Sequence, residues 1–383
     1  MAKVPETMHS IQLVKFGPPK EAMFFNEQTP VPQIKTDSQV LVRIKAAGIN
    51  PIDAKLASGN LKIGTRFMTL PTIPGADFSG VIVAKGAKVD GFEIGDHVFG
   101  SKPVLFGGEG VFAQYGVIDT KVAAIAKKPD HLSFEQAASA GIPVITAYDG
   151  IIKNGHINEN NKQKKRNILI IGASGGVGSY GVQLAKAINQ ENTVIGICSE
   201  KNIAFVKSLG ADRVIDYKNK DAYKSFINEK IPFDIIFDCV GGDEYYNQLD
   251  PLLVEHGVYS TAVGPVEYAG SSQVNISTVA TVLKSVLYKK LFSAHSYIVV
   301  TALSLTDFKL KVAPFFDDNQ IKGTVWSEEN IFPLKDADEC TWNLFEYLLV
   351  PAVQPWVKST FSESNTSDEK EWQLDNQFTA NKG

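Results

Sequence analysis

Residues 167–188 read NILIIGASGGVGSYGVQLAKAI, and this stretch decides the fold. It opens with a short uncharged apolar run, which is typical of a strand buried on both faces of a parallel sheet. Glycines at the spacing GxxGxxG separate this run from a pattern with helical periodicity. A strand, a glycine turn and a helix in this order are the context that a dinucleotide fingerprint requires. The stretch therefore predicts the first βα unit of a nucleotide-binding sheet.

Each glycine of the turn has its own physical role. Gly172 permits the tight turn, Gly175 lets the backbone approach a pyrophosphate, and Gly178 brings the helix close to the strand. The peptide N–H groups at the helix start then hold the phosphate. The commoner spacing is GxGxxG, and methyltransferases use a similar turn for another nucleotide. A purely structural turn also remains as an alternative.

The segments around this unit indicate two kinds of module. Residues 193–264 alternate strand-like and helix-like patterns, which predicts a parallel sheet with helices on both faces. From Ser10 to about His131 the sequence contains short alternating segments broken by Gly, Pro and Asp, which indicates an all-β module. A helical pattern over 133–152 joins the two. Two further helices are expected over 305–321 and 337–349, and a polar, disordered tail from about Pro355. The fold class is therefore α/β, a doubly wound parallel sheet plus a β module.

Composition narrows the possible functions. A length of 383 residues fits two domains, and 38 Lys and Arg against 42 Asp and Glu give a net charge of -4. Without a basic field, nucleic-acid binding is disfavoured. The cysteines Cys198, Cys239 and Cys340 stand far apart, which disfavours a disulfide framework and a Cys-rich zinc knuckle. No secretory signal or apolar span of about 18 residues is found, so we expect a soluble, cytoplasmic protein.

The end of the second strand predicts the cofactor type. About 20 residues beyond the glycines an acid would bind an NAD ribose, but Cys198 stands there, followed by Ser199, Glu200, Lys201 and Asn202. A hydroxyl and an ammonium suit the 2′-phosphate of NADPH. Glu200 opposes this interpretation if its side chain turns inward, and the alternative for Glu200 and Lys201 is a solvated helix start.

The chain resembles the zinc-free quinone oxidoreductase branch of the medium-chain dehydrogenase/reductase superfamily over nearly all of residues 10–346, and most closely its plant enone reductases. The matching stretches besides the glycine turn are AAGINPIDAKLASG (46–59), IPGADFSGVIVAKGAKVDGFEIGDHVFG (73–100), GIPVITAYDG (141–150), KSLGADRVIDYKN (207–219) and FDIIFDCVGG (233–242).

The resemblance implies a domain organisation and a set of cofactor contacts. It implies a GroES-like β-barrel catalytic domain over 1–138 and again over 294–350, a Rossmann domain over 139–293, and an atypical polar tail over 351–383. NADPH would lie in the cleft between the domains. The implied contacts are Lys55, Thr146, Gly172, Ser174, Gly175, Gly176, Val177, Gly178, Ser199, Lys201, Asn202, Tyr217, Val240 and Val263.

The sequence also departs from the zinc-dependent branch of that superfamily. Where that branch has a Cys and a Gly-His-Glu, this chain has Asn50 and residues 74–77, Pro-Gly-Ala-Asp, so no zinc site is expected. Without a Lewis acid, a conjugated carbonyl is the easier hydride acceptor because its charge spreads into an enolate. Lys55, with Asn50 as second donor, is the candidate to stabilise that charge. The alternatives are a surface lysine and a turn-stabilising asparagine, and a structural role is favoured for Asp53.

These observations predict an NADPH-dependent reductase of α,β-unsaturated carbonyls or of quinones. One-electron reduction of quinones is a rival of the same class. A catalytically weak NADPH-binding scaffold protein is the alternative from another class, because Glu200 and the unusual C-terminal residues depart from the family pattern. A homodimer and contacts with a lipid surface remain open.

Overall fold

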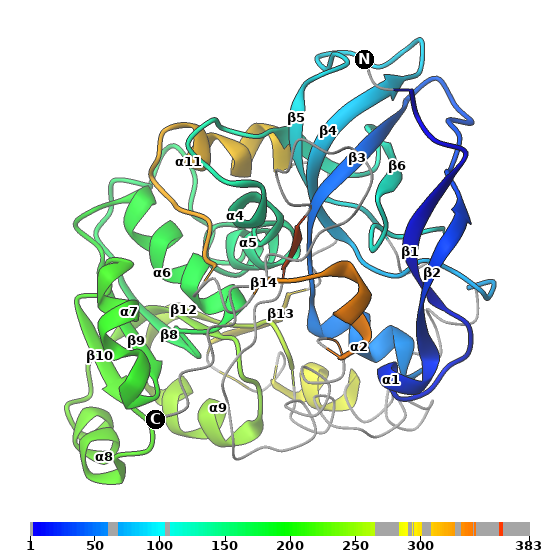
Figure 1. Cartoon of the computed structure of the whole chain (residues 1–383). Coiled ribbons are helices and arrows are strands. Elements are labelled where there is room, and N and C mark those ends of the chain that lie inside the picture. The colour runs from blue at the N-terminus through cyan, green and yellow to red at the C-terminus, as the bar shows by residue number, and fades with distance from the viewer. Residues whose placement is uncertain are drawn as a thin grey trace, which may run out of the picture.

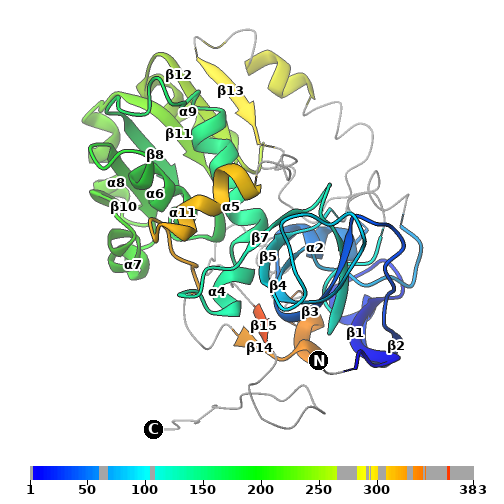
Figure 2. The same ribbon diagram turned by 90° about the horizontal axis from the view of Figure 1, so that it is seen from above.

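A computed structural model describes residues 3–59, 68–103, 108–264, 283–289, 293, 295–300, 308–325, 331–339, 341 and 360–362. Within these ranges the strands form a two-stranded, a six-stranded and a seven-stranded sheet. The views in Figures 1 and 2 both show helices α4 and α5 between the two larger sheets. The molecule therefore has two lobes. The predicted fold class, a parallel sheet plus a separate β module, is confirmed.

The six-stranded sheet is parallel throughout, in the order β10-β9-β8-β11-β12-β13. Its strands are β8 (Asn167–Ile171), β9 (Thr193–Cys198), β10 (Arg213–Asp216), β11 (Phe233–Asp238), β12 (Leu253–Thr261) and β13 (Ser296–Val299). In chain order this is 3-2-1-4-5-6, the doubly wound arrangement of a Rossmann sheet. Because β13 belongs to it, the sheet continues past residue 293, where its domain was expected to end.

Helices connect these strands as the alternating pattern predicts. The helices of this lobe are α6 (Gly176–Ile188), α7 (Ile203–Ser208), α8 (Lys220–Asn228) and α9 (Asp243–Leu249). The helix-like pattern of residues 246–257 includes 253–257, but these residues belong to β12. The reason is Pro251, which lies in a short 3-10 turn and ends the helical stretch.

The helix expected over 133–152 is divided. It consists of α4 (Phe134–Ala138), α5 (Gly141–Tyr148) and a π-helical turn over Asp149–Lys153. Ser133 caps α4 by accepting a hydrogen bond from the Gln136 N–H, as its sequence predicts. Of the two later helical segments, residues 308–317 form a π-helical turn and α11 (Ala313–Asp317). Residues 342–349 of the other lie outside the described residues.

The second lobe is built on the seven-stranded sheet, in the order β14-β15-β3-β4-β5-β7 with β6 paired to β3. Its strands are β3 (Gln39–Gly48), β4 (Asp77–Lys85), β5 (His97–Ser101), β6 (Tyr115–Asp119), β7 (Ala124–Lys127), β14 (Ile331–Phe332) and β15 (Thr360–Ser362). Beside it lie the hairpin β1 (Thr7–Leu13) and β2 (Met23–Pro30), and the helices α1 (Pro19–Ala22) and α2 (Pro51–Ala57).

The C-terminal segment differs from the expected polar tail at one place. Residues 360–362 form β15, which pairs with β3 and β14. A strand of three residues is too short to show a pattern in a polar sequence. The other residues of the expected tail, 351–359 and 363–383, lie outside the described ranges.

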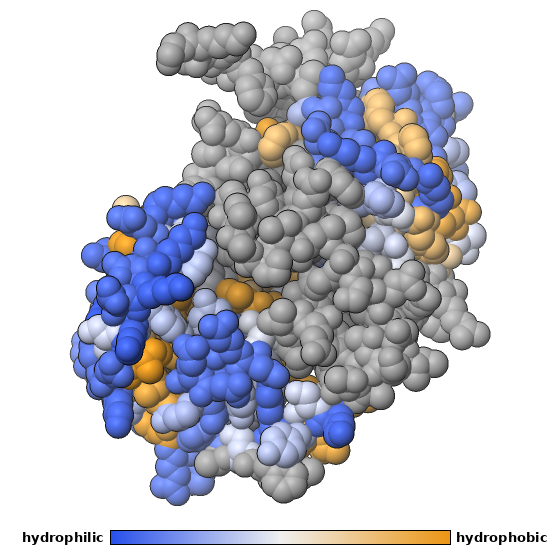
Figure 3. All heavy atoms as spheres, turned by 90° about the horizontal axis from the view of Figure 1, so that it is seen from below, coloured by the Kyte–Doolittle hydropathy of each residue, from blue (hydrophilic) through white to orange (hydrophobic). Residues whose placement is uncertain are grey.

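A shared apolar core joins the two lobes. Phe99 of β5 packs edge-on against Phe308 and Phe316, with ring centroids 5.3 and 5.5 Å apart. The same core includes Ile168 and Ile170 of β8. On the face shown in Figure 3 the described residues are mainly hydrophilic, with small separate apolar groups between them. Burial of apolar surface therefore fixes the lobes against each other.

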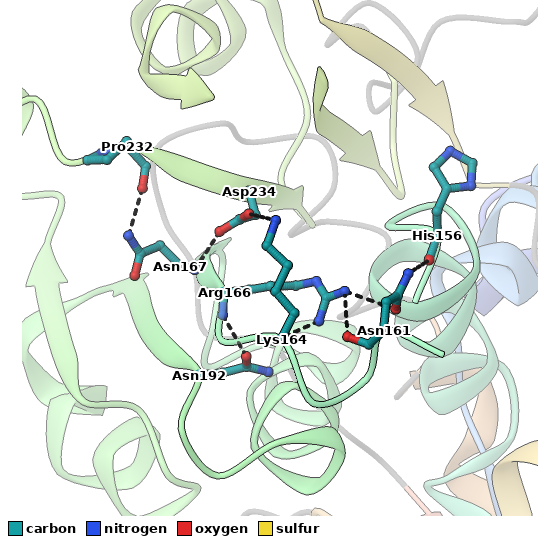
Figure 4. Close-up of polar contacts among 8 residues, drawn as sticks. All are labelled: His156, Asn161, Lys164, Arg166, Asn167, Asn192, Pro232 and Asp234. Atoms are coloured by element: carbon teal, nitrogen blue, oxygen red, sulfur yellow. Dashed lines mark hydrogen bonds and ion pairs between the residues drawn. The ribbon is translucent and has the colours of Figure 1, made fainter. Parts of the chain in front are cut away.

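At the amino edge of the six-stranded sheet a cluster of hydrogen-bonded polar side chains holds the loop before β8 (Figure 4). The buried Arg166 guanidinium donates to the carbonyl oxygens of Lys164 and Asn161, at 2.8 and 3.1 Å, and to the Asn161 side chain. Asn192 accepts from the Arg166 N–H, and Asp234 accepts from the Asn167 N–H, both at 2.9 Å. These bonds fix where β8 begins.

Candidate active site

The glycine turn after β8 has the geometry that its spacing predicts. Gly172 has φ +73°, a conformation that favours glycine. A Cβ on Gly178 would lie 2.2 Å from the Gly172 oxygen, so only glycine lets α6 pack this close to the strand. Helix α6 spans 13 residues, and its N-cap is Gly175, which has no side chain that could accept from the first N–H groups. The first N–H groups of the helix are therefore available to an anion.

The loops after β11 and β12 lie beside this turn. A Cβ on Gly172 would come within 2.9 Å of a methyl group of Val240, and one on Gly241 would be equally near Val263. Strand order reverses between β8 and β11, which is where ligands bind in doubly wound sheets. Val240 and Val263 thus lie at the expected crevice.

Asp238, at the end of β11, holds the loop that carries Val240. Its carboxylate accepts from the N–H groups of Val240 and Gly241 at 2.9 and 2.8 Å, and from the Tyr259 hydroxyl at 3.0 Å. Burial raises the pKa of Asp238, although these donors oppose the shift. Asp238 was not among the predicted site residues. A carboxylate at the end of the apolar run FDIIFD was the signal that could have found it.

The ends of β9 and β10 form the region predicted for the 2′-phosphate. Ser199 and Asn202 are buried, whereas Glu200 and Lys201 are exposed. The Asn202 amide donates to the Ser174 hydroxyl at 2.9 Å, and its Oδ1 has no hydrogen-bond partner among the described residues. The Tyr217 N–H donates to the Cys198 oxygen at 3.2 Å, which keeps the two strand ends together. The predicted side chains therefore gather at one edge.

The thiols near this edge are not poised for reaction. Burial raises the pKa of Cys198 to about 12, and Asp216 adds to that shift. Cys239 is fully buried, and its pKa is also raised, chiefly by desolvation. Both cysteines therefore remain neutral thiols at physiological pH.

Thr146, predicted to contact the cofactor, lies on helix α5. The Thr146 hydroxyl is nearly buried and donates to the Ile142 oxygen at 2.8 Å. Its oxygen retains lone pairs for one more donor. Ile142, on the same helix, packs on an apolar cluster with Leu56 of α2 and Ala76. Helix α5 thus packs against elements of both lobes.

Asn50 and Asp53 lie at the start of α2, across from α5. The Asn50 N–H donates to Asp53 at 2.7 Å, and its side-chain amide donates to Asp77 at 2.8 Å. The carboxylate of Asp77 also accepts from the Ile142 N–H of α5, with both oxygens at 2.9 Å. One N–H of the Asn50 amide is therefore used within the protein, which leaves its second N–H as the donor for a ligand.

Burial sets the protonation of both acids. It raises the pKa of Asp53 to about 8, against the Asn50 N–H, and Asp77 adds to the shift. It raises the pKa of Asp77 to about 7, against hydrogen bonds that include those from Asn50 and Ile142. Sequence reasoning named Asp77 only as a replaced zinc-ligand position. The sequence signal that could have identified Asp77 was an acid at the start of a buried strand.

Lys55 lies on α2, two residues beyond Asp53. Its side chain is partly buried, and desolvation lowers its pKa. No ion pair to its ammonium group occurs among the described residues, which exclude its neighbours 60–67. A partly desolvated cation on the helix that Asn50 caps suits a developing negative charge.

The described residues contain no group of three or more His, Cys, Asp or Glu side chains able to hold a metal ion. Within the same ranges, no helix combines the length and the apolar character needed to cross a bilayer. Residues 104–107 and Cys340 lie outside these ranges, so a zinc-free cleft remains a prediction.

Two family models match the chain. Residues 36–130 match the "Alcohol dehydrogenase GroES-like domain", and residues 176–313 match the "Zinc-binding dehydrogenase" model. The first match covers most of the seven-stranded sheet, and the second covers α6 and most of the six-stranded sheet. The GroES-like part of the fold prediction is thereby confirmed.

Curated relatives have names that refer to redox enzymes. A tomato 2-methylene-furan-3-one reductase is 35% identical over 63% of this chain, and the alignment spans 59% of its own length. A spinach chloroplastic quinone-oxidoreductase homolog is 37% identical over 67% of this chain and 76% of the relative. The matches thus cover between about half and three quarters of the relatives' lengths.

Solved structures share the whole architecture. A quinone oxidoreductase from Coxiella burnetii superposes with a TM-score of 0.69 at 27% identity, over 93% of this chain and 99% of that one. An alcohol dehydrogenase superfamily protein from Novosphingobium aromaticivorans gives a TM-score of 0.72 at 23% identity, with the same coverage. The second similarity speaks only for the fold.

Proposed function

Because this chain belongs to the medium-chain dehydrogenase/reductase superfamily, we propose that it is an oxidoreductase that uses NADPH to reduce conjugated carbonyls or quinones. The observation that supports this most strongly is the glycine turn at the switch point, next to an uncapped 13-residue helix. Such a turn fits a dinucleotide pyrophosphate.

The residues of the crevice fit this cofactor. The start of α6, from Ser174 to Gly178, would hold the pyrophosphate, because its N–H groups are uncapped and a larger residue at Gly178 would block the turn. Thr146, Val240 and Val263 would line the nicotinamide side. When bound, the reduced nicotinamide supplies a hydride.

The preference for NADPH over NADH is proposed from the end of β9. No carboxylate occupies the strand end, and Lys201 is exposed two residues beyond Ser199. Glu200 is also exposed, whereas Ser174 and Asn202 are buried and hydrogen-bonded to each other, so the Glu200 carboxylate takes no part in that buried contact. Ser199, Lys201, Asn202 and Tyr217 are the residues proposed to surround the extra phosphate.

On the substrate side, Lys55 and Asn50 are proposed to stabilise the oxygen of the carbonyl. Addition of hydride to the β-carbon places negative charge on that oxygen, and the α-carbon then takes a proton from water. The Lys55 ammonium and the second N–H of the Asn50 amide would each lower the energy of this charge. Asp53 keeps its proton below about pH 8, so it does not repel the enolate.

The test is a screen of the purified full chain against short and long enones and quinones, following oxidation of NADPH and of NADH by absorbance. We expect faster turnover with NADPH and transfer of deuterium from labelled NADPH to a product carbon. Deuterium absent from carbon would favour one-electron quinone reduction. Binding of NADPH without any oxidation would favour the scaffold alternative.

The cellular context is part of the same proposal. We propose a cytoplasmic protein, whereas several relatives are named as chloroplast or mitochondrial proteins. A homodimer is also proposed, and sedimentation of the purified chain checks it. Cell fractionation with a tagged full chain checks the compartment.

A further inference from the structure

One carboxylate joins the two sides of the cleft. Asp77 begins β4 in the seven-stranded sheet, and its oxygens accept from the Ile142 N–H in the first turn of α5 at 2.9 Å. The same group accepts from the Asn50 side chain at 2.8 Å. Asn50 is the proposed donor to the substrate, and α5 carries Thr146, which is proposed to contact the cofactor. The positions of both therefore depend on a single acid.

The surrounding chain is shaped to admit this acid. A Cβ on Gly141 would lie 2.2 Å from the carboxylate, and one on Gly48 would lie 3.2 Å from the Asp77 Cβ. The helix dipole at the amino end of α5 favours a negative charge there. The Asn50 amide and the Ile142 N–H both donate hydrogen bonds to Asp77, and an ionised carboxylate is the form that accepts from both. The site is therefore built for the charged form of Asp77.

We infer that Asp77 is a positioning residue that latches α5 and Asn50 together when it is ionised and releases them when it is protonated. This inference rests on the proposed function, because it assigns a reaction role to Asn50 and Thr146. Protonation puts a hydrogen on a group that faces donors, so the bonds to Asn50 and Ile142 weaken. Cleft geometry and turnover then change together.

The neighbouring titratable groups place this transition near neutral pH. Burial raises the pKa of Asp77 to about 7. Asp53, from α2, interacts with it electrostatically and has a pKa of about 8, so Asp53 keeps its proton while Asp77 loses one. From α6, Tyr180 is also coupled to Asp77, but burial raises its own pKa, so it remains neutral throughout. Asp77 is therefore the group that changes charge first as pH rises.

The test follows the Ile142 amide in the wild-type full chain by NMR between pH 5.5 and 8.5. We expect its chemical shift to titrate with a midpoint near 7 and its hydrogen exchange, corrected for intrinsic rates, to slow about tenfold above it. Turnover per KM should rise over the same interval. A flat Ile142 titration would overturn the inference, whether or not the protein reduces enones.

Variants separate the latch from general effects of charge. Asp77→Asn and Gly141→Ala should each remove the Ile142 titration and flatten the pH profile of kcat/KM. Asp212→Asn is the matched control, because Asp212 also accepts from a main-chain N–H, that of Val194 at 2.7 Å. It precedes β10 of the six-stranded sheet, whereas Asp77 lies in the seven-stranded sheet. If Asp77→Asn retains the Ile142 titration, the assignment is wrong. If only activity is absent, the proposed function fails and the latch stands.

Discussion

The two edges of the six-stranded sheet use buried polar groups in opposite ways. At the amino edge, the Arg166 guanidinium donates to Asn161 and to main-chain carbonyl oxygens, and Asn192 accepts from the Arg166 main-chain N–H (Figure 4). At the carboxyl edge, α6 begins uncapped and Asn202 keeps an acceptor without a partner among the described residues. Buried polar groups that satisfy one another stabilise a fold, whereas groups with spare bonding capacity are suited to a ligand.

This difference separates stability from binding in residues of similar burial. A substitution at the amino edge should lower the free energy of unfolding and leave cofactor affinity unchanged. A substitution at the carboxyl edge should do the reverse, except where the backbone itself is displaced. Asp53 and Asp77 are a third case. Burial of these acids lowers the stability of the fold, and their hydrogen bonds fix the positions of Asn50 and α5.

The largest effect should come from Gly178→Ala. The added Cβ would meet the Gly172 oxygen at 2.2 Å and two further backbone atoms below 3 Å, so the turn must shift away from the phosphate position. We expect NADPH affinity to fall by about a thousandfold, or about 4 kcal/mol. Fluorescence titration of the folded variant measures this. Gly17→Ala is the control, since nothing lies within 4 Å of that Cβ. Wild-type affinity in Gly178→Ala would contradict the turn's role.

Asp53→Asn should have the next largest effect, and it depends on pH. The unfolded carboxyl ionises near 3.8, whereas the folded one ionises near 8. Between these values the unfolded state has lost the proton that the folded state keeps, so rising pH favours unfolding of the wild type. The variant lacks this term. Its free energy of unfolding relative to wild type should therefore rise with pH, by at most about 1.4 kcal/mol per unit.

Urea unfolding of both proteins at pH 5, 6.5 and 8 measures that difference. Asp96→Asn serves as the control, because Asp96 pairs with Lys127 near the surface and its pKa is lowered rather than raised. A constant difference across the three pH values would show that Asp53 is ionised in the folded protein. The repulsion between Asp53 and an enolate would then return as an objection to Lys55 and Asn50.

The sequence predicts these two edges unequally. The order of the six strands and the glycine turn follow from patterns within about ten residues, because a buried strand and a tight turn leave local signals. The contact between Asp77 and Ile142 joins residues 65 apart. Nothing in the nearby sequence indicates that pairing. The helix predicted over 133–152 is interrupted before Gly141, next to the Ile142 N–H that makes this contact.

The candidate site was predictable only where a motif placed it. The residues of the turn and of the strand ends all lie at the carboxyl edge of the six-stranded sheet, because their positions depend on the same sheet. Their contacts with a cofactor stay a prediction. Asp53 was given only a structural role and Asp77 only a replaced zinc-ligand position. Their raised pKa values were not predicted, since burial and shared hydrogen bonds decide their protonation. Strand β15 was also missed, because a three-residue strand gains its stability from β3 rather than from its own sequence.

Arg166→Met should act on stability alone. Methionine is nearly as long but donates no hydrogen bonds, so the carbonyl oxygens of Asn161 and Lys164 lose their partner. We expect the free energy of unfolding to fall by about 2 to 3 kcal/mol. The dissociation constant of NADPH should stay within twofold. Thermal unfolding and fluorescence titration of the same preparation measure both. A large loss of affinity with normal stability would show that the amino edge communicates with the cofactor site.

The smallest effect expected is that of Lys201→Ala at the carboxyl edge. Lys201 is exposed and next to the buried Asn202, so its ammonium is free to reach a phosphate without desolvation of the fold. Loss of one charged hydrogen bond should weaken NADPH by about 1 to 3 kcal/mol and leave NADH nearly unchanged. Lys207→Ala, an exposed lysine of α7, is the matched control. Equal weakening of NADPH and NADH would instead place Lys201 away from the 2′-phosphate. The preference for NADPH over NADH would then depend on the buried Ser174, Ser199 and Asn202. These side chains are uncharged, so they would bind the phosphate by neutral hydrogen bonds only.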